Sequence, residues 1–335
     1  MLGPLAWRVV SRVAVDPATL LTEARQGNRG SLARLLSIVE RGGAAAEALG
    51  RLVALSTDAH VIGITGAPGA GKSTLTNVLC SEIRKGGDEV AVLAVDPSSP
   101  YSGGAILGDR VRMGDQTGDD GVYIRSMATR GQLGGLAVAT PAAIRVLSAV
   151  GIPWVVVETV GVGQVEIDIA GAADTTVVVL NPGWGDAVQA NKAGLMEIAD
   201  IFVINKADRS GADETGADLR RMLALAARGD SAPRIVATVA TEGTGVEELW
   251  AAVREHRRHG IETGELARRR ERRTHDELEA VVVAELARRT AAVRGGDRWE
   301  RTVAQVVAGE LDLWSAARGL LDAEGDESRW YRSET

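Results

Sequence analysis

The chain has 335 residues, of which 45% are hydrophobic and 25% are charged, a composition that excludes a disordered or collagen-like protein. The net charge of −7 at pH 7 argues against a protein that binds nucleic acid by neutralising its phosphates. Cys80 is the single cysteine, so neither an internal disulfide nor a zinc site built from thiolates can form. No apolar run reaches the roughly 20 residues of a membrane span. We therefore expect a globular protein of the cytoplasm, with no nucleic-acid partner and no membrane contact.

Helical signals come first in the chain. Asp16 followed by Pro17 is a typical N-cap with proline at the first helical position, and apolar residues recur behind it at helical spacing. Ser31 predicts the start of a second helix, and a third is expected over 44–55. Residues 1–57 are therefore predicted to form an N-terminal helical extension.

Six short apolar runs follow, each with the length and composition of a buried strand. They lie at 61–65, 90–95, 154–158, 175–180, 201–205 and 235–239. Helical patterns separate several of them and are expected over 73–85, 140–149, 213–227 and 245–258. This alternation predicts an α/β domain over 58–260 with a mostly parallel sheet covered on both faces. The apolar spacing within 261–335 predicts a C-terminal helical region.

The first predicted strand runs into a glycine-rich loop with the pattern GxxxxGKS, placed between a strand and a helix as a P-loop requires. Glycines let backbone N–H groups converge on phosphates at a helix N-terminus, Lys72 reaches the outer phosphates, and the Ser73 hydroxyl can hold Mg²⁺. The residues predicted to bind the phosphates are Gly66, Ala67, Pro68, Gly69, Ala70, Gly71, Lys72, Ser73 and Thr74.

A second motif, NKxD, follows the predicted strand 201–205. The Asp208 carboxylate can accept hydrogen bonds from the ring N–H and the exocyclic amine of guanine, which adenine does not offer in that arrangement. Asn205 and Lys206 complete the motif. Only four of the 38 basic residues are lysines, yet one stands in each of the two motifs, which indicates that both positions need a compact ammonium.

Carboxylates that could serve the terminal phosphate and Mg²⁺ lie between these motifs. Glu158 ends the strand 154–158 and precedes Gly161, in the place where many GTPases have DxxG. Asp96 and Asp109 bracket a glycine-rich segment with the character of a switch. Val162 stands where fast GTPases of the Ras type have a glutamine, so slow intrinsic hydrolysis is expected. The predicted catalytic residues are Lys72, Asp109, Glu158 and Gly161.

Taken together, the P-loop and the segments 95–113, 124–137, 157–170 and 192–208 resemble the MeaB/ArgK family of GTPases, which includes the human methylmalonic aciduria type A protein. The resemblance covers about 58–260. It implies a P-loop NTPase fold of the SIMIBI type, flanked by N-terminal and C-terminal helical extensions. It also implies metal contacts by Ser73, Asp96, Asp109 and Glu158, and guanine contacts by Asn205, Lys206, Asp208, Val239 and Ala240. Val239 stands where the family usually has serine, but its backbone N–H is expected to stay available.

The resemblance further implies a function: a chaperone that binds and hydrolyses GTP with Mg²⁺ and serves an adenosylcobalamin-dependent acyl-CoA mutase, methylmalonyl-CoA mutase or a close relative. The client is expected to stimulate hydrolysis, and the C-terminal helices resemble the dimerisation arm of a homodimer. Residues 58–63 happen to match the cobalamin signature DxHxxG, but the histidine enters a strand directly and the downstream partners of that signature are missing. No direct cobalamin binding is therefore expected.

Two other functions stay open: an ATPase or kinase linked to amino-acid transport, which the NKxD motif disfavours, and a GTPase that matures nickel sites. Trp184, Asp186 and Lys192 lie in a glycine-flanked loop after the strand 175–180 and could form a third switch or a partner contact. The arginine-rich run 268–273 is interpreted as a solvated helix face, with docking of an acidic partner as the alternative.

Overall fold

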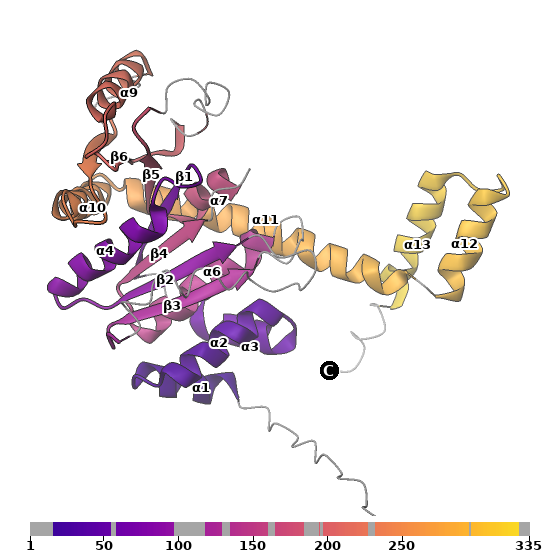
Figure 1. Cartoon of the computed structure of the whole chain (residues 1–335). Coiled ribbons are helices and arrows are strands. Elements are labelled where there is room, and N and C mark those ends of the chain that lie inside the picture. Colours follow the sequence, from indigo (N-terminus) through magenta and orange to yellow (C-terminus); the bar gives the residue numbers. More distant parts are fainter. Residues whose placement is uncertain are drawn as a thin grey trace, which may run out of the picture. The chain divides into compact units, whose positions relative to one another are not determined.

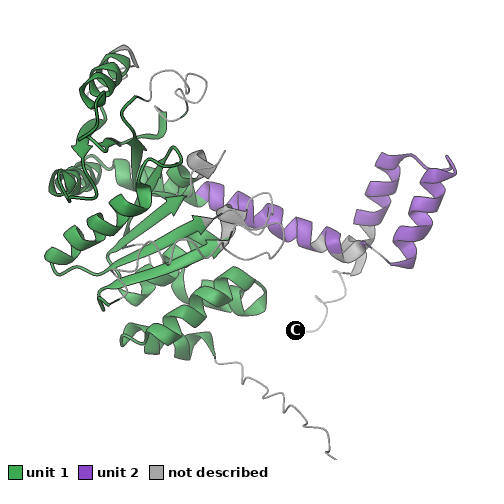
Figure 2. Cartoon of the chain, viewed as in Figure 1, with its two compact units in different colours: residues 1–274 green, residues 275–335 purple. Residues whose placement is uncertain are grey.

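The structure is a computed structural model that describes residues 16–54, 58–96, 118–128, 135–159, 165–183, 194, 197–226, 232–294 and 296–327. The chain divides into two compact units (Figure 2), unit 1 at 1–274 and unit 2 at 275–335.

Unit 1 is built on a seven-stranded sheet of order β3-β2-β4-β1-β5-β6-β7 in which every pairing is parallel (Figure 1). The predicted α/β fold with flanking helical extensions is confirmed. The strands are β1 (His60–Gly66), β2 (Val90–Asp96), β3 (Val122–Ala128), β4 (Trp154–Thr159), β5 (Thr175–Leu180), β6 (Ile201–Asn205) and β7 (Arg234–Thr238). Since parallel strands end at the same edge, the loops after β1, β4 and β6 meet there.

Strand β3 was not among the six strands that the apolar runs predict. It lies at the edge of the sheet and pairs with β2 alone. Its central residues, from Tyr123 to Ser126, are half-buried rather than buried, so the segment lacks the continuous apolar run of an inner strand. An edge strand with half-buried residues has a weaker apolar pattern, and the sequence therefore did not predict β3.

Helices cover both faces of the sheet. On one face lie α1 (Pro17–Arg25), α2 (Arg29–Arg41), α3 (Ala44–Val53), α6 (Gly135–Val150) and α7 (Val165–Ala172), which share a core with alternate residues of β1, β2 and β4. The opposite face packs against α4 (Lys72–Lys85) and α10 (Val246–Glu262). Helix α9 (Ala212–Ala226) packs on β5 and β6 in a third cluster. Two starts differ from the prediction: Asn28 caps α2, and α6 begins before Pro141, which lies inside it.

Arginines as well as apolar contacts hold α1 and α2 to the rest of unit 1. Arg25 donates from Nε to the carbonyl oxygen of Ala149 at 2.8 Å. Arg125 of β3 donates to Glu40 of α2 at 2.6 Å, with both side chains largely buried. The helical extension therefore shares its core with the sheet and with α6, and it makes an ion pair with β3.

Gly63 lets α7 approach β1 closely. A Cβ at this position would lie 2.5 Å from Cγ2 of Ile169 and 2.9 Å from Cβ of Ala173. We expect Gly63→Ala to lower the free energy of unfolding by about 1–3 kcal/mol, because the buried helix must shift outward. Urea unfolding measures this loss. Gly50→Ala is the control, because Gly50 lies in α3 with open space around its Cα; it should be neutral or stabilising, and an equal loss in both variants would contradict the packing argument.

Unit 2 consists of helices that expose apolar side chains. Helix α11 (Glu265–Val293) begins in unit 1 and ends in unit 2, and α12 (Asp297–Val307) and α13 (Leu313–Glu327) follow. The exposed apolar residues are Leu278, Val281, Val282, Val283, Leu286, Val303, Val307, Leu313, Trp314 and Leu321. In the described part of the chain, no helix combines the length and the apolar character needed to cross a membrane.

Candidate nucleotide-binding site

The P-loop connects β1 to α4 at the carboxyl edge of the sheet. Lys72, the first residue of α4, is buried, and its ammonium donates to the carbonyl oxygens of Gly66 at 2.8 Å and Ala67 at 3.1 Å. The ammonium is thus held over the loop at the N-terminus of a helix, where backbone N–H groups and the helix dipole favour an anion. Pro68, Gly69 and Thr74 are exposed along the same stretch.

Asn205 joins the two predicted motifs. Its amide nitrogen donates to the carbonyl oxygen of Ala70 at 2.8 Å, across the gap between the β6 end and the P-loop. Its amide oxygen accepts from the backbone N–H of Ala240 and from the hydroxyl of Thr238, both at 3.1 Å. One buried side chain therefore holds together the P-loop, the end of β6 and the loop after β7.

Lys206 supplies a second link. Its backbone has φ of 59°, in the left-handed region that non-glycine residues rarely adopt, and its ammonium donates to the carbonyl oxygen of Gly69 at 2.6 Å. Gly71 makes room for this arrangement: its φ is 91°, and a Cβ there would lie 2.4 Å from Nδ2 of Asn205. The NKxD loop and the P-loop therefore interlock, and the exposed Asp208 follows on the outer side.

Ser73 and Glu158 meet at the inner end of the site. The Ser73 hydroxyl donates to Oε1 of Glu158 at 2.5 Å, and the Glu158 residue is buried at the end of β4. A hydroxyl beside a carboxylate is an oxygen donor set of the kind that Mg²⁺ prefers. Ser73 and Glu158 thus fit Mg²⁺ and would hold it through their oxygen atoms.

The N–H groups after β7 are already engaged. Val239 donates to the carbonyl oxygen of Thr244 at 3.0 Å, and Ala240 donates to Asn205. In this conformation the two N–H groups fix the loop after β7, and their contact with the base stays a prediction.

Several predicted residues cannot be placed. The backbone of Asp96 ends β2 beside Ala128, but its side chain lies outside the description. The predicted residues outside the described ranges are Asp109, Gly161, Trp184, Asp186 and Lys192.

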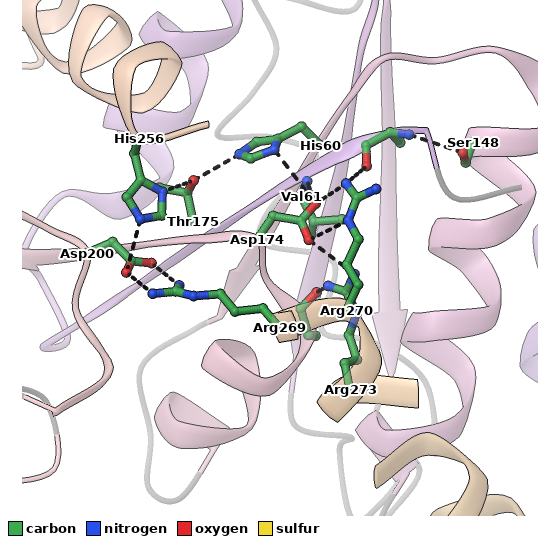
Figure 3. A network of polar contacts seen from close by, with 12 residues as sticks. His60, Val61, Ser148, Asp174, Thr175, Asp200, His256, Arg269, Arg270 and Arg273 are labelled. Carbon is green, nitrogen blue, oxygen red and sulfur yellow. Dashed lines mark hydrogen bonds and ion pairs between the residues drawn. The ribbon is translucent and has the colours of Figure 1, made fainter. Parts of the chain in front are cut away.

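A second polar cluster, unforeseen from the sequence, lies at the opposite, amino edge of the sheet (Figure 3). Two aspartates precede β5 and β6: the buried Asp174 accepts from Arg270 and Arg273, and the half-buried Asp200 accepts from Arg269. The run 268–273, interpreted above as a solvated helix face, therefore supplies three ion-pair partners within unit 1. We call Arg269, Arg270 and Arg273 the arginine clamp.

Burial and ion pairing set the ionisation of this cluster. Burial alone would raise the pKa of Asp200, but hydrogen bonds from His256 and Arg269 lower it to about 2. Burial likewise opposes ionisation of Asp174, yet the hydrogen bond and charge of Arg270 and the charge of Arg273 keep its pKa below the usual range. Both carboxylates are therefore charged at neutral pH.

His60 belongs to the same cluster. It is fully buried, its Nε2 lies 2.9 Å from the Thr175 hydroxyl, and burial lowers the pKa of its ring to about 3. The match of 58–63 to the cobalamin signature thus has a structural explanation: the histidine packs at the amino edge of the sheet, and Gly63 admits α7.

A parallel sheet whose P-loop is interlocked with an NKxD loop defines the class of P-loop GTPases. The family model of the methylmalonyl-CoA mutase-associated GTPase MeaB matches residues 32–294. The chain belongs to this family of GTPases, and the family resemblance drawn from the motifs is confirmed.

Relatives agree with this assignment. A Pyrococcus horikoshii protein assigned by name to the GTPases is 46% identical over 308 residues, which span 90% of this chain and 96% of that protein. The GTPase ArgK of Escherichia coli is 33% identical over 302 residues, spanning 86% of this chain and 91% of its own. A solved structure of an LAO/AO transport system kinase superposes with a TM-score of 0.66 at 25% identity, covering 93% of this chain and 99% of that one.

Proposed function

We propose that this GTPase is a Mg-GTP-dependent switch that chaperones an adenosylcobalamin-dependent acyl-CoA mutase, methylmalonyl-CoA mutase or a close relative, in cobalamin loading and protection. The match to a family described as mutase-associated carries this proposal. A Mus musculus relative named as a methylmalonic aciduria type A homolog, 35% identical over 272 residues, supports it. In this proposal the GTPase and its client mutase act together in the cytoplasm.

The site residues take the following roles in this proposal. P-loop amides and Lys72 bind the phosphates of GTP, and Ser73 and Glu158, with Asp96 and Asp109, hold Mg²⁺. The metal ion supplies positive charge that stabilises the phosphoryl group in transfer. The contact between the Ser73 hydroxyl and the buried Glu158 carboxylate supports the metal assignment.

Guanine selectivity rests on Asp208, the exposed residue that follows the interlocked loops. We expect Asp208→Asn to weaken GDP binding by roughly 2–4 kcal/mol, because a charge-assisted pair of hydrogen bonds is lost, and to shift the preference toward xanthine nucleotides. Isothermal titration with GDP and XDP measures both effects. Asp213→Asn, in the first turn of α9, is the control and should leave GDP binding unchanged; unchanged GDP affinity in Asp208→Asn would remove the guanine assignment.

Hydrolysis by the isolated protein is expected to be slow, because Val162 cannot orient water, and a client mutase should accelerate it by ordering the switches. Single-turnover GTP hydrolysis with and without each candidate mutase measures this. The absence of acceleration by every candidate would contradict the chaperone function while leaving the GTPase intact.

The loop of Trp184, Asp186 and Lys192 is proposed as the segment that responds to the client. In the same assay, Lys192→Ala should keep GDP affinity within about threefold of the wild type and lower the stimulated rate at least about tenfold. Equal loss of basal and stimulated hydrolysis would place Lys192 in the nucleotide site instead.

Unit 2 is proposed as the dimerisation arm of a homodimer. Its exposed valines and leucines, with Trp314 about 78% exposed, form more apolar surface than isolated helices normally leave in water. Sedimentation equilibrium of the full chain, compared with Val307→Glu, tests this; a monomeric wild type would contradict it.

A second candidate function is favoured by the solved structure named as a transport system kinase. Competition between GTP and ATP for the site, and a search for phosphoryl transfer to a protein acceptor, separate the two functions. Preference for ATP would replace the first proposal by the second.

A further inference from the structure

The first turns of α11 are attached to unit 1 mainly by charge. In the described part of α11, no side chain is buried, and Leu266 is only half-buried. The arginine clamp provides the attachment instead. Arg269 makes two hydrogen bonds to the Asp200 carboxylate at 2.7 and 2.8 Å, and Arg270 makes two to Asp174 at 2.7 and 3.1 Å. Fork-shaped pairs of this kind fix direction as well as distance.

The clamp also grips the end of α7. Arg273 donates from Nη1 to the carbonyl oxygen of Ala172, the last residue of α7, at 2.6 Å, and from Nη2 to Asp174 at 3.1 Å. Arg270 reaches the carbonyl oxygen of Ala59, just before β1, at 2.9 Å. Figure 3 shows these arginines converging on Asp174. The first turns of α11 therefore contact three places at once: the end of α7, the residue before β1 and the residue before β5.

Helix α7 links this clamp to the nucleotide site. Its first residue, Val165, follows the segment 160–164, which itself follows Glu158 at the end of β4. Ile169 of α7 is fully buried and lies against Gly63, so the helix is stiffly packed along β1. In the sequence, α7 thus begins shortly after Glu158, and its last residue, Ala172, is the one that Arg273 contacts.

We infer that the arginine clamp couples the nucleotide state to the C-terminal arm through α7. A shift of α7 between the GDP and GTP states changes the hydrogen bonds that Arg273 and Arg270 make. Hydrogen bonds between guanidinium groups and their acceptors are strong only in a narrow range of distances and angles. A small shift of α7 therefore changes how strongly Arg270 and Arg273 attach α11, the helix that continues into unit 2. The inference rests on the GTPase activity of the family and is independent of which client the protein serves.

Amide hydrogen exchange of the full chain tests this coupling. The exchange rates of peptides from 265–274 are measured twice, once with GDP bound to the full chain and once with a non-hydrolysable GTP analogue bound. We expect the wild type to exchange at rates that differ at least about threefold between the two nucleotides, and Arg273→Ala to remove that difference. GDP affinity should stay within about threefold, because Arg273 lies at the amino edge of the sheet, away from the P-loop.

Arg272→Ala is the matched control, since Arg272 is exposed on the same helix and pairs only within α11, with Glu265 at 3.1 Å, among the contacts described for it. It should keep the wild-type difference. Arg273→Lys, which retains a positive charge beside Asp174 but not two donors, guards against a folding defect and should also reduce the difference.

The outcomes separate coupling from simple fastening. A fastening role raises exchange in Arg273→Ala by the same factor with both nucleotides and keeps the difference between them, which would overturn the inference. Equal exchange in the two nucleotide states of the wild type would overturn it as well. Loss of the difference in Arg273→Ala, with the control unchanged, supports it. Mutase-stimulated hydrolysis, measured separately, shows whether the proposed client function stands.

Discussion

Asp174→Asn should lower the free energy of unfolding by about 3 kcal/mol, because it leaves the two half-buried guanidinium groups of Arg270 and Arg273 without their buried, charged partner. Asp174 is about 1% exposed and accepts hydrogen bonds from Arg270, Arg273 and the backbone N–H of Val61. Urea unfolding of the full chain measures the change. Asp218→Asn is the control: Asp218 is exposed on α9 and pairs with Arg221, so its loss should cost less than about 1 kcal/mol.

The same variant should alter the response to acid. The folded-state pKa of Asp174 lies below its unfolded value, so its ionisation contributes stability above about pH 4 that is lost as the pH falls. Asp200, with a pKa of about 2, acts in the same direction. Between about pH 4 and pH 2, stability should therefore fall less steeply in Asp174→Asn than in the wild type. Equal slopes, with equal stability at neutral pH, would refute the buried ion-pair cluster.

Lys72→Ala should reduce GTP hydrolysis by at least about a thousandfold, roughly 4 kcal/mol of transition-state stabilisation. The buried ammonium at the start of α4 donates to two P-loop carbonyl oxygens, those of Gly66 at 2.8 Å and Ala67 at 3.1 Å. Single-turnover hydrolysis at saturating GTP measures the loss, and thermal unfolding shows whether the fold is kept.

The chain offers a matched control on the same helix. Lys85 is the last residue of α4, is exposed and pairs with Glu82, so Lys85→Ala should hydrolyse GTP at the wild-type rate. Lys72→Arg should be nearly as impaired as Lys72→Ala, because a planar guanidinium cannot replace a compact ammonium inside the loop. Full activity of Lys72→Arg would show that any positive charge is sufficient there.

The fold could be predicted largely from local patterns. Inner strands such as β1 and β4 are continuous apolar runs, and the P-loop and NKxD motifs are short, contiguous and placed after strands. The hydrogen bonds of Asn205 to Ala70 and Ala240, which join the two motifs, were not predicted, because they depend on the strand order. The half-buried edge strand β3 was missed because its alternation is weak.

The arginine clamp could not be predicted for a different reason. Arg269 and Asp200 are 69 residues apart, and Arg270 and Asp174 are 96 apart, so no local spacing connects them. A run of arginines and glutamates has the pattern of a solvated helix, and the position of each aspartate just before a buried strand was the available signal. An aspartate before a buried strand predicts an ion pair only when the basic residue that pairs with it is known.

The absence of buried apolar side chains from the described part of α11 has a consequence for solubility. If the clamp opens, the groups that meet water are guanidinium and carboxylate groups, which hydrate strongly, and no large apolar area of α11 is uncovered in those turns. Opening of the clamp would therefore expose charged groups of 269–273 rather than a new apolar patch of α11, and newly exposed apolar patches are where misassembly begins. On the α11 side, the contact between 269–273 and the two aspartates therefore adds no aggregation-prone surface when it is broken.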